Sequence, residues 1–206
     1  MVRKTKEDAS ITRQLIIDAA REVFAVRGVS RTTLEHIATQ AGVTRGAVYW
    51  HFENKIDLFN AMREQVLLPL IDRMEDKQLD NLNTDPLTAL ENALKTTIAG
   101  LETCAITRQT YEIMMTKCEY VDDLSLSLET IMLNCQSIVE KYVVTYTRAQ
   151  QLGLISSQLN PAQLAMDTHL FFGGLLHLWV KDFRGTHVRA NSNNIIEAHI
   201  QLRRRQ

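Results

Sequence analysis

The stretch AGVTRGAVYWHF, residues 41–52, places a Thr-Arg-Gly triplet shortly before three aromatic residues in four positions. The guanidinium of Arg45 has the fork that pairs with the edge of a guanine. Thr44, Arg45 and Gly46 stand where the first residues of a recognition helix point at base edges, and Gly46 leaves room for a close backbone approach. The donors of Tyr49 and His51 suit phosphate oxygens. These residue types therefore indicate hydrogen bonding to a partner that carries bases and phosphates.

No residue pattern in the sequence indicates catalysis. There is no phosphate-binding glycine loop, no nucleophile elbow and no metal-ligand spacing. The cysteines Cys104, Cys118 and Cys135 are odd in number and widely spaced, which favours neither disulfides nor a zinc site and is typical of a reducing cytoplasm. His169 and His177 share a helical face, so a metal pair is an alternative to interface or core histidines. We predict a cytoplasmic protein that is not an enzyme and has no cofactor or metal.

The elements around the triplet have the pattern of a helix-turn-helix. Gly42 can form the turn between two steeply crossing helices, and Ala38, four residues earlier, is small enough for the second helix to cross there. Trp50 and Phe52 are interpreted as core residues, and His51 falls where the pattern expects a last apolar residue. The apolar positions that would seal the wedge between the helices are Leu34, Ile37, Ala41, Val43 and Val48.

The second helix of such a pair presents its first residues to base edges in the major groove, while flanking residues bind the backbone. The helix N-terminus also favours a phosphate. The basic arm Arg3-Lys4-Thr5-Lys6 is either a further groove or backbone contact or a solvated tail. The predicted DNA contacts are Thr33, Thr44, Arg45, Gly46, Tyr49, His51 and Lys55.

The apolar pattern of the rest of the chain predicts an all-α protein. Apolar residues recur every three or four positions, as at Leu15, Ala19, Val23 and Val26, without a period-two strand. Helices are expected at about 8–27, from Thr33 to Gly42, after Thr44, from 54 onward, and at about 86–102, 106–118, 123–152, 161–182 and 192–204. The expected caps and breaks are Gly28, Gly42 and Gly153 at C-termini, Thr32 or Thr33, Thr44 and Asn160 at N-termini, Pro86 and Pro161 in first turns, and a kink at Pro69.

Charge is distributed unevenly along the 206 residues. The net charge is −1, yet residues 1–55 contain nine Lys/Arg and six Asp/Glu. This basic N-terminal quarter favours an anionic partner for that part alone. No apolar run reaches the roughly 20 residues that span a bilayer, and the charged N-terminus does not resemble a secretory signal. No membrane association is predicted.

The segment TTLEHIATQAGVTRGAVYWHFENKIDLF closely resembles the DNA-binding signature of the TetR family, and RKTKEDASITRQLIIDAAREVFAVRGVSRTTL extends the match toward the N-terminus. The fragment YEIMMTKCEYVDDL resembles part of the ligand-binding domain of the AcrR-type repressors of multidrug efflux pumps. The resemblance implies an all-helical homodimer, with a three-helix DNA-binding domain over 1–53 and a larger ligand-binding and dimerisation domain over 54–206. It also implies that the DNA contacts named above carry over.

The C-terminal body has residues that suit a sensor. Gly173 and Gly174 lie together inside an apolar helix, at a cost of roughly 1 kcal/mol each relative to alanine, which a close helix–helix approach would offset. We expect the dimer interface at Gly173, Gly174, His177, Ile196 and Ile200, as a four-helix arrangement of two chains. Methionine, cysteine and aromatic side chains suit an adaptable apolar pocket, although ordinary core is the alternative. The predicted ligand-binding residues are Tyr111, Met114, Met115, Cys118, Cys135, Phe171, Phe172 and Glu112.

These features predict a ligand-responsive transcriptional repressor that binds a palindromic operator as a homodimer. Small amphipathic compounds, cationic or aromatic, would release it and so control a multidrug efflux gene. A carboxylate such as Glu112 would select cationic ligands, unless it and its neighbours Glu102 and Glu119 lie on solvated faces. Two alternatives stay open: a helix-turn-helix regulator whose C-terminal domain binds a protein partner, and a transcriptional activator.

Overall fold

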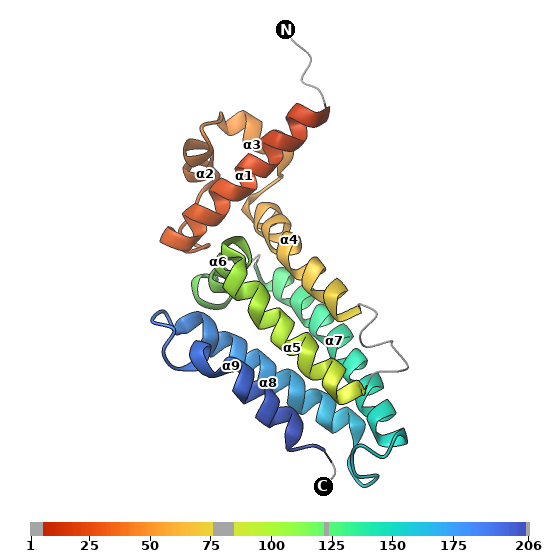
Figure 1. The fold of residues 1–206 in the computed structure, drawn as a ribbon. Coiled ribbons are helices and arrows are strands. Elements are labelled where there is room, and N and C mark those ends of the chain that lie inside the picture. Colours follow the sequence, from red (N-terminus) through yellow and green to blue (C-terminus); the bar gives the residue numbers. More distant parts are fainter. Residues whose placement is uncertain (1–5, 76–84, 122–123, 205–206) are drawn as a thin grey trace. The chain divides into compact units, whose positions relative to one another are not determined.

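The protein was analysed as a computed structural model that describes residues 6–75, 85–121 and 124–204, with the side chains of 67–75 excluded. Every regular element in these ranges is a helix, as predicted (Figure 1). The helices are α1 (Lys6–Arg27), α2 (Leu34–Ala41), α3 (Arg45–His51), α4 (Lys55–Glu75), α5 (Pro86–Thr103), α6 (Ala105–Glu112), the π-helix η1 (Ile113–Lys117), α7 (Ser125–Gln151), α8 (Pro161–Lys181) and α9 (Val188–Gln201).

Most helix ends lie at the predicted residues, where local capping interactions fix them. Gly28 follows α1 with φ of 78°, and Gly42 follows α2 with φ of 65°, a left-handed conformation that favours glycine. Thr33, rather than Thr32, is the N-cap of α2, and the ring of His36 completes its capping box. Asn160 caps α8, and Pro86 and Pro161 lie in the first turns of α5 and α8. The kink at Pro69 stays a prediction.

Two helix assignments differ from the prediction. The helix expected over 106–118 is α-helical only to Glu112, after which η1 continues with the wider π geometry. At its end the backbone N–H of Val29 donates to the carbonyl of Lys117 over 2.9 Å, which joins η1 to the segment after α1. The last helix begins at Val188, four residues before the expected start at 192, and ends at Gln201.

The chain forms two compact units, one of residues 1–67 and 109–128 and the other of residues 68–108 and 129–206. The first unit therefore combines α1–α3 with the start of α4 and with η1, whereas the predicted division fell between residues 53 and 54; that functional division stays a prediction. In its core Phe24 and Phe59 pack edge to face, with ring centroids 6.1 Å apart. Leu15 and Val26, two of the apolar positions used above to recognise α1, are exposed.

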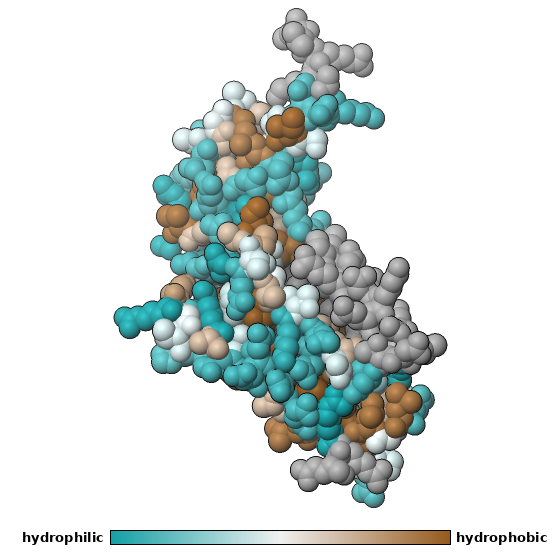
Figure 2. Space-filling view, viewed as in Figure 1, coloured by the Kyte–Doolittle hydropathy of each residue, from teal (hydrophilic) through white to brown (hydrophobic). Residues whose placement is uncertain are grey.

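The second unit has its core among α5, α7, α8 and α9, where Trp179 is 1% exposed. A buried hydrogen-bonded chain connects three of these helices: Tyr146 Oη lies 2.7 Å from Thr168 Oγ1, which lies 3.2 Å from His199 Nε2. The ring of Phe171 stacks on that of His199 with centroids 3.6 Å apart. No helix in the described ranges is long and apolar enough to cross a membrane. The face seen in Figure 2 is mainly hydrophilic, with separate groups of hydrophobic atoms.

Candidate nucleic-acid interface

The segment from α2 to α3 has the geometry of a helix-turn-helix. Gly42 turns the chain in the left-handed conformation, and the N–H of Val43 donates to the carbonyl of Ala38 over 3.0 Å. Ala38 is 2% exposed and Val48 is fully buried, as expected for residues that seal the wedge between the two helices. In this way α3 is held with most of its other residues at the surface.

Val48 fixes which side of α3 is exposed. Residues two positions away lie about 200° around a helix axis, so Gly46 and Trp50 occupy the stripe opposite Val48. Arg45 and Tyr49 form a stripe on one side of it, and both are exposed. The exposed face of α3 therefore combines a bare backbone position, a guanidinium and two aromatic rings.

Arg45 and Tyr49 contact one another across one turn of α3. Arg45 Nη2 donates to the phenolic oxygen of Tyr49 over 3.2 Å, and the guanidinium carbon lies 5.3 Å from the ring centroid. The hydrogen bond that Arg45 donates to Tyr49 raises the pKa of Arg45 above its ordinary value, and the cation is fully exposed. Arg45 is thus a permanent positive charge that is already oriented along the exposed face.

Thr33 and Thr44 each use their hydroxyl oxygen to cap a helix. The Thr33 oxygen accepts from the N–H of His36 over 3.3 Å, and the Thr44 oxygen accepts from that of Ala47 over 3.2 Å. A hydroxyl that accepts still has its own hydrogen to donate. Both side chains are exposed, so they can donate to phosphate while keeping their caps.

Lys55, at the first residue of α4, donates from Nζ to the carbonyl of Ser30 over 3.0 Å. Partial burial lowers its pKa from the ordinary value. An ammonium group has three donors, so this contact positions the charge and leaves two donors for a phosphate. The lysine therefore has a structural role that the sequence did not reveal.

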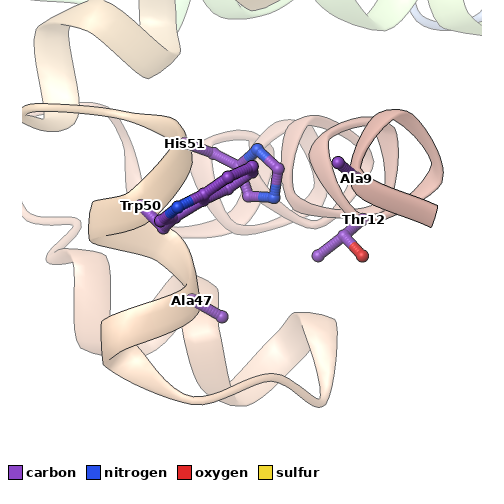
Figure 3. Close-up of a pocket in the computed structure, with 5 residues that line it drawn as sticks. All are labelled: Ala9, Thr12, Ala47, Trp50 and His51. Atoms are coloured by element: carbon purple, nitrogen blue, oxygen red, sulfur yellow. The ribbon is translucent and has the colours of Figure 1, made fainter. Parts of the chain in front are cut away.

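His51 lines a cavity of about 350 Å³, which we call the α1–α3 cleft. Its other lining residues are Ala9 and Thr12 of α1 and Ala47 and Trp50 of α3. Figure 3 shows the rings of Trp50 and His51 beside each other at its edge. Their centroids are 4.5 Å apart and their planes are nearly perpendicular, at 88°.

The core interpretation of Trp50 is wrong, whereas that of Phe52 is confirmed. Trp50 is 71% exposed and Phe52 is 1% exposed. The guanidinium of Arg13 covers the Phe52 ring, 4.9 Å from its centroid. Hydrophobicity alone pointed to the core, but the angular position of Trp50 opposite Val48 would have placed it at the surface.

The eight predicted ligand-binding residues are divided between the two units. Tyr111, Glu112, Met114, Met115 and Cys118 belong to α6, η1 and the residue after it, in the first unit. Cys135, Phe171 and Phe172 belong to the second. None of the eight lines the α1–α3 cleft or a second cavity of about 770 Å³ beside the start of α4. Their role in ligand binding stays a prediction.

The three glutamates considered for cation selection and the thiol of Cys118 are all at least partly accessible. Glu112 is half-buried, whereas Glu102 and Glu119 are exposed, as the solvated alternative expected. Burial raises the pKa of the Cys118 thiol to about 11, so this cysteine is protonated at neutral pH.

The predicted dimer-interface residues need one correction. Ile196 and Ile200 are 0% exposed within the single chain, so they belong to the core of the second unit and have no surface to offer a partner. Gly174 is exposed and Gly173 and His177 are half-buried. A Cβ added at either glycine would meet no atom of the described chain within 4 Å. On the same face, Met166, Leu170, Gly174 and Leu178 form an exposed stripe at intervals of four residues.

Comparison with known proteins gives two family matches. Residues 16–62 match the model described as bacterial regulatory proteins, tetR family, and residues 85–204 match that of the MAATS-type transcriptional repressor, C-terminal region. The transcriptional regulator TtgR of Pseudomonas putida is 35% identical over 183 residues, which cover 87% of this chain and 85% of that protein.

Two solved structures are similar over nearly the whole chain. NalD, the secondary repressor of the MexAB-OprM multidrug efflux pump in Pseudomonas aeruginosa, is 32% identical with a TM-score of 0.84, over 98% of this chain and 100% of that one. The complex of triclosan with SmeT, the repressor of the Stenotrophomonas maltophilia multidrug efflux pump SmeDEF, is 27% identical with a TM-score of 0.82, over 95% and 93%.

Proposed function

This chain belongs to the TetR family of bacterial transcriptional repressors, and from that premise we propose that it binds a palindromic operator as a homodimer and is released by small amphipathic compounds. The regulated gene would be one for multidrug efflux, and the protein would act in the cytoplasm, where the DNA is. The observation that carries the proposal is the exposed face of α3, with Arg45 and Tyr49 in contact and both capping threonines at the surface.

The proposed DNA contacts divide into two classes. Arg45 is the candidate for base recognition because its fork reaches two acceptors of a guanine. Thr33, Thr44, Tyr49, His51 and Lys55 are candidates for the phosphate backbone, which fixes the register of the helix without reading sequence. Gly46 lies on the stripe opposite Val48, where the absence of a side chain lets α3 approach the bases.

The homodimer proposal is supported by the exposed stripe on α8. Met166, Leu170 and Leu178 are 47%, 65% and 54% exposed. An aligned apolar row with glycine at its centre suits close packing against the same row of a second chain. Two recognition helices held in this way must sit roughly 34–36 Å apart to enter successive major grooves.

The ligand proposal is supported by the relatives. The SmeT structure holds triclosan, a small molecule, and both SmeT and NalD are repressors of multidrug efflux pumps. A ligand can release DNA only through a preference for the conformation that does not bind it. We further propose that the ligand is cationic or aromatic.

The test is a titration of the purified protein against labelled duplexes selected from a random pool. Recovery of a palindrome, bound by two chains, is expected, and triclosan, dyes and cationic drugs should then be screened for release of the complex. If no duplex binds at modest ionic strength, the DNA-binding proposal fails. If the duplex binds and no compound weakens it, the ligand part alone fails, and a protein partner becomes the better explanation of the C-terminal unit.

A further inference from the structure

Arg63 of α4 is a buried cation without a counter-ion in the described part of the chain. It is 1% exposed, and no carboxylate of the described residues lies within ion-pairing distance of it. By contrast, Arg21 of α1 is 4% exposed and forms an ion pair with Asp18 over 2.6 Å. A charge that leaves water without an opposite partner costs free energy. The burial of Arg63 therefore needs a reason other than stability.

The guanidinium of Arg63 makes fewer hydrogen bonds than its donors allow. Nη1 donates to the backbone carbonyl of Ser127 over 2.9 Å, whereas Nε is buried and has no partner among the described atoms. Burial lowers the pKa of Arg63 from its ordinary value, and Glu64, Tyr120 and Cys118 oppose this shift in part. An arginine with such a shift is still charged at neutral pH. The cation is thus buried for the sake of one contact, with Ser127.

Ser127 joins α4 to the first turn of α7. Its carbonyl accepts from Arg63, and its hydroxyl donates to Asn60 Oδ1 over 3.0 Å. Asn60 and Arg63 are three residues apart, so they lie on the same face of α4. Ser127 is itself 1% exposed, which shields these hydrogen bonds from water. The three residues all belong to the first unit, and we call them the α4–α7 joint.

Open space borders the α4–α7 joint. The second cavity, of about 770 Å³, is lined by Asn60, by residues at the start of α4 and by Leu126 of α7. Leu126 is 65% exposed, although it precedes the buried Ser127. A helical turn beside open volume can shift without displacing close-packed side chains, which a turn inside a core cannot do. The hydrogen bonds of Ser127 are therefore well placed to decide where the first turn of α7 lies against α4.

The α4–α7 joint connects the recognition helix to α7 by a short route. His51 ends α3 and Lys55 begins α4, so α4 follows the recognition helix closely. The helix α7 extends from Ser125 to Gln151, and its residues from 129 onward belong to the second unit. Because consecutive backbone hydrogen bonds make a helix stiff, a displacement of α7 in the second unit reaches Ser127 and, through the joint, α4.

We propose that Arg63 couples the recognition helix to the second unit through the α4–α7 joint, and that the protein keeps this buried cation at a cost in stability. This inference rests on the proposed function and names a residue that regulates it. Because coupling between two sites is reciprocal, operator binding must alter α7 as strongly as a change in α7 alters operator binding. Arg63 is a positioning residue, since its burial keeps it from touching DNA.

Hydrogen exchange measures this coupling with the operator duplex as the only probe. In the parent protein, a saturating amount of the selected operator should slow the exchange of the α7 amides over 129–135 by at least about 5-fold. Arg63→Met replaces the cation with an unbranched apolar side chain, so this slowing should disappear while operator affinity stays that of the parent. The melting temperature of Arg63→Met should equal or exceed that of the parent, because the change removes a buried charge and breaks no ion pair.

Arg21→Met is the matched control. It removes a similarly buried arginine of the same unit, but one that is paired with Asp18, so its melting temperature should fall while the α7 amides still respond to the operator. Ser127→Ala is a graded variant. It removes the hydrogen bond to Asn60 and keeps the carbonyl that Arg63 binds, so part of the slowing should remain.

Three outcomes would overturn the coupling role of Arg63. A melting temperature of Arg63→Met well below that of the parent would identify an ordinary stabilising residue. Slowing of equal size in Arg63→Met and in the parent would show that the signal reaches α7 by another route. The absence of slowing in a parent protein that binds the operator would show that no signal reaches α7. Failure of the parent protein to bind any duplex would instead refute the proposed function itself.

Discussion

Arg45 Nη2 lies 3.2 Å from the phenolic oxygen of Tyr49, and the guanidinium covers the Tyr49 ring four residues along α3. An arginine held in this way has fewer rotamers to lose when it reaches a base than one that moves freely in water. The contact therefore links a residue proposed to read sequence with one proposed to bind the backbone.

Replacing Arg45 tests base reading. Arg45→Ala should cost on the order of 1–3 kcal/mol on the operator and should relax the base preference at one position of each half-site. Tyr49→Phe should show a smaller loss, because the ring stays while the hydrogen bond to Arg45 is removed. Competition assays with single-base operator variants measure both effects. Unchanged selectivity in Arg45→Ala would remove this residue from sequence readout.

Replacing Lys55 tests phosphate binding. Lys55→Met keeps much of the side-chain stem and removes the charge, so affinity should fall equally on operator and scrambled duplexes, and the salt slope should decrease by about 1. Because Lys55 also donates a hydrogen bond to the carbonyl of Ser30, the thermal unfolding of the variant must be measured as well, to separate lost stability from lost DNA contact. Lys95→Met, which removes an amine that is paired with Glu91 in the second unit, is the control and should leave the salt slope unchanged.

Gly174→Ala distinguishes a free face of α8 from a dimer interface. In the isolated chain the added methyl group meets nothing within 4 Å, so alanine should stabilise the helix by roughly 0.5–1 kcal/mol. If a second α8 packs on this glycine, as proposed, the dimer should dissociate more readily in sedimentation experiments. A variant with a higher melting temperature and unchanged dimer affinity would place the interface elsewhere.

His199 should make the protein less stable in mild acid. Burial, reinforced by the nearby Arg203 and opposed by Asp167, lowers the pKa of His199 to about 4. In the unfolded chain a histidine titrates near pH 6.5, so between about pH 6.5 and 4 the unfolded state binds a proton that the folded state does not. The free energy of unfolding should therefore decrease as the pH falls through this window, by on the order of 2 kcal/mol between pH 7 and pH 5.

Denaturant titrations at pH 7 and pH 5 measure this decrease. His199→Gln cannot take up the proton and should lose less stability over the same interval, even though it starts from a lower value because the stacking with Phe171 is altered. Equal losses in the two proteins would show that other groups govern the acid response.

The features predicted correctly from sequence are those set by local chemistry. Gly42, Thr44 and Asn160 define helix ends through backbone conformation or a hydrogen bond within three residues, so neighbouring residues suffice to identify them. The π geometry of η1 was missed because the sequence pattern of a π turn is that of an ordinary α-helix. It lies where the chain meets the segment after α1, a contact between residues far apart in sequence.

The errors at the proposed site arose from treating hydrophobicity as a guide to burial. Trp50, Ile196 and Ile200 are all apolar, yet the first is exposed and the others are core. The difference depends on which stripe of a helix faces the protein, and that is known only once the neighbouring helices are placed. Lys55 was predicted as a phosphate contact because it opens the helix that follows the recognition helix, but its contact with Ser30 required the fold.

The bond from Val29 to Lys117 joins two main-chain atoms, so it is indifferent to the identity of either side chain. Replacing the residue at position 117 should therefore leave this hydrogen bond intact. At position 29 only proline would remove the N–H donor. Deleting one residue within Ile113–Lys117 has a different effect, because it rotates the Lys117 carbonyl by about 100° around the helix axis and so away from the Val29 N–H. In a library of random deletions, this five-residue turn should therefore be intolerant of length changes while accepting most replacements at its last position.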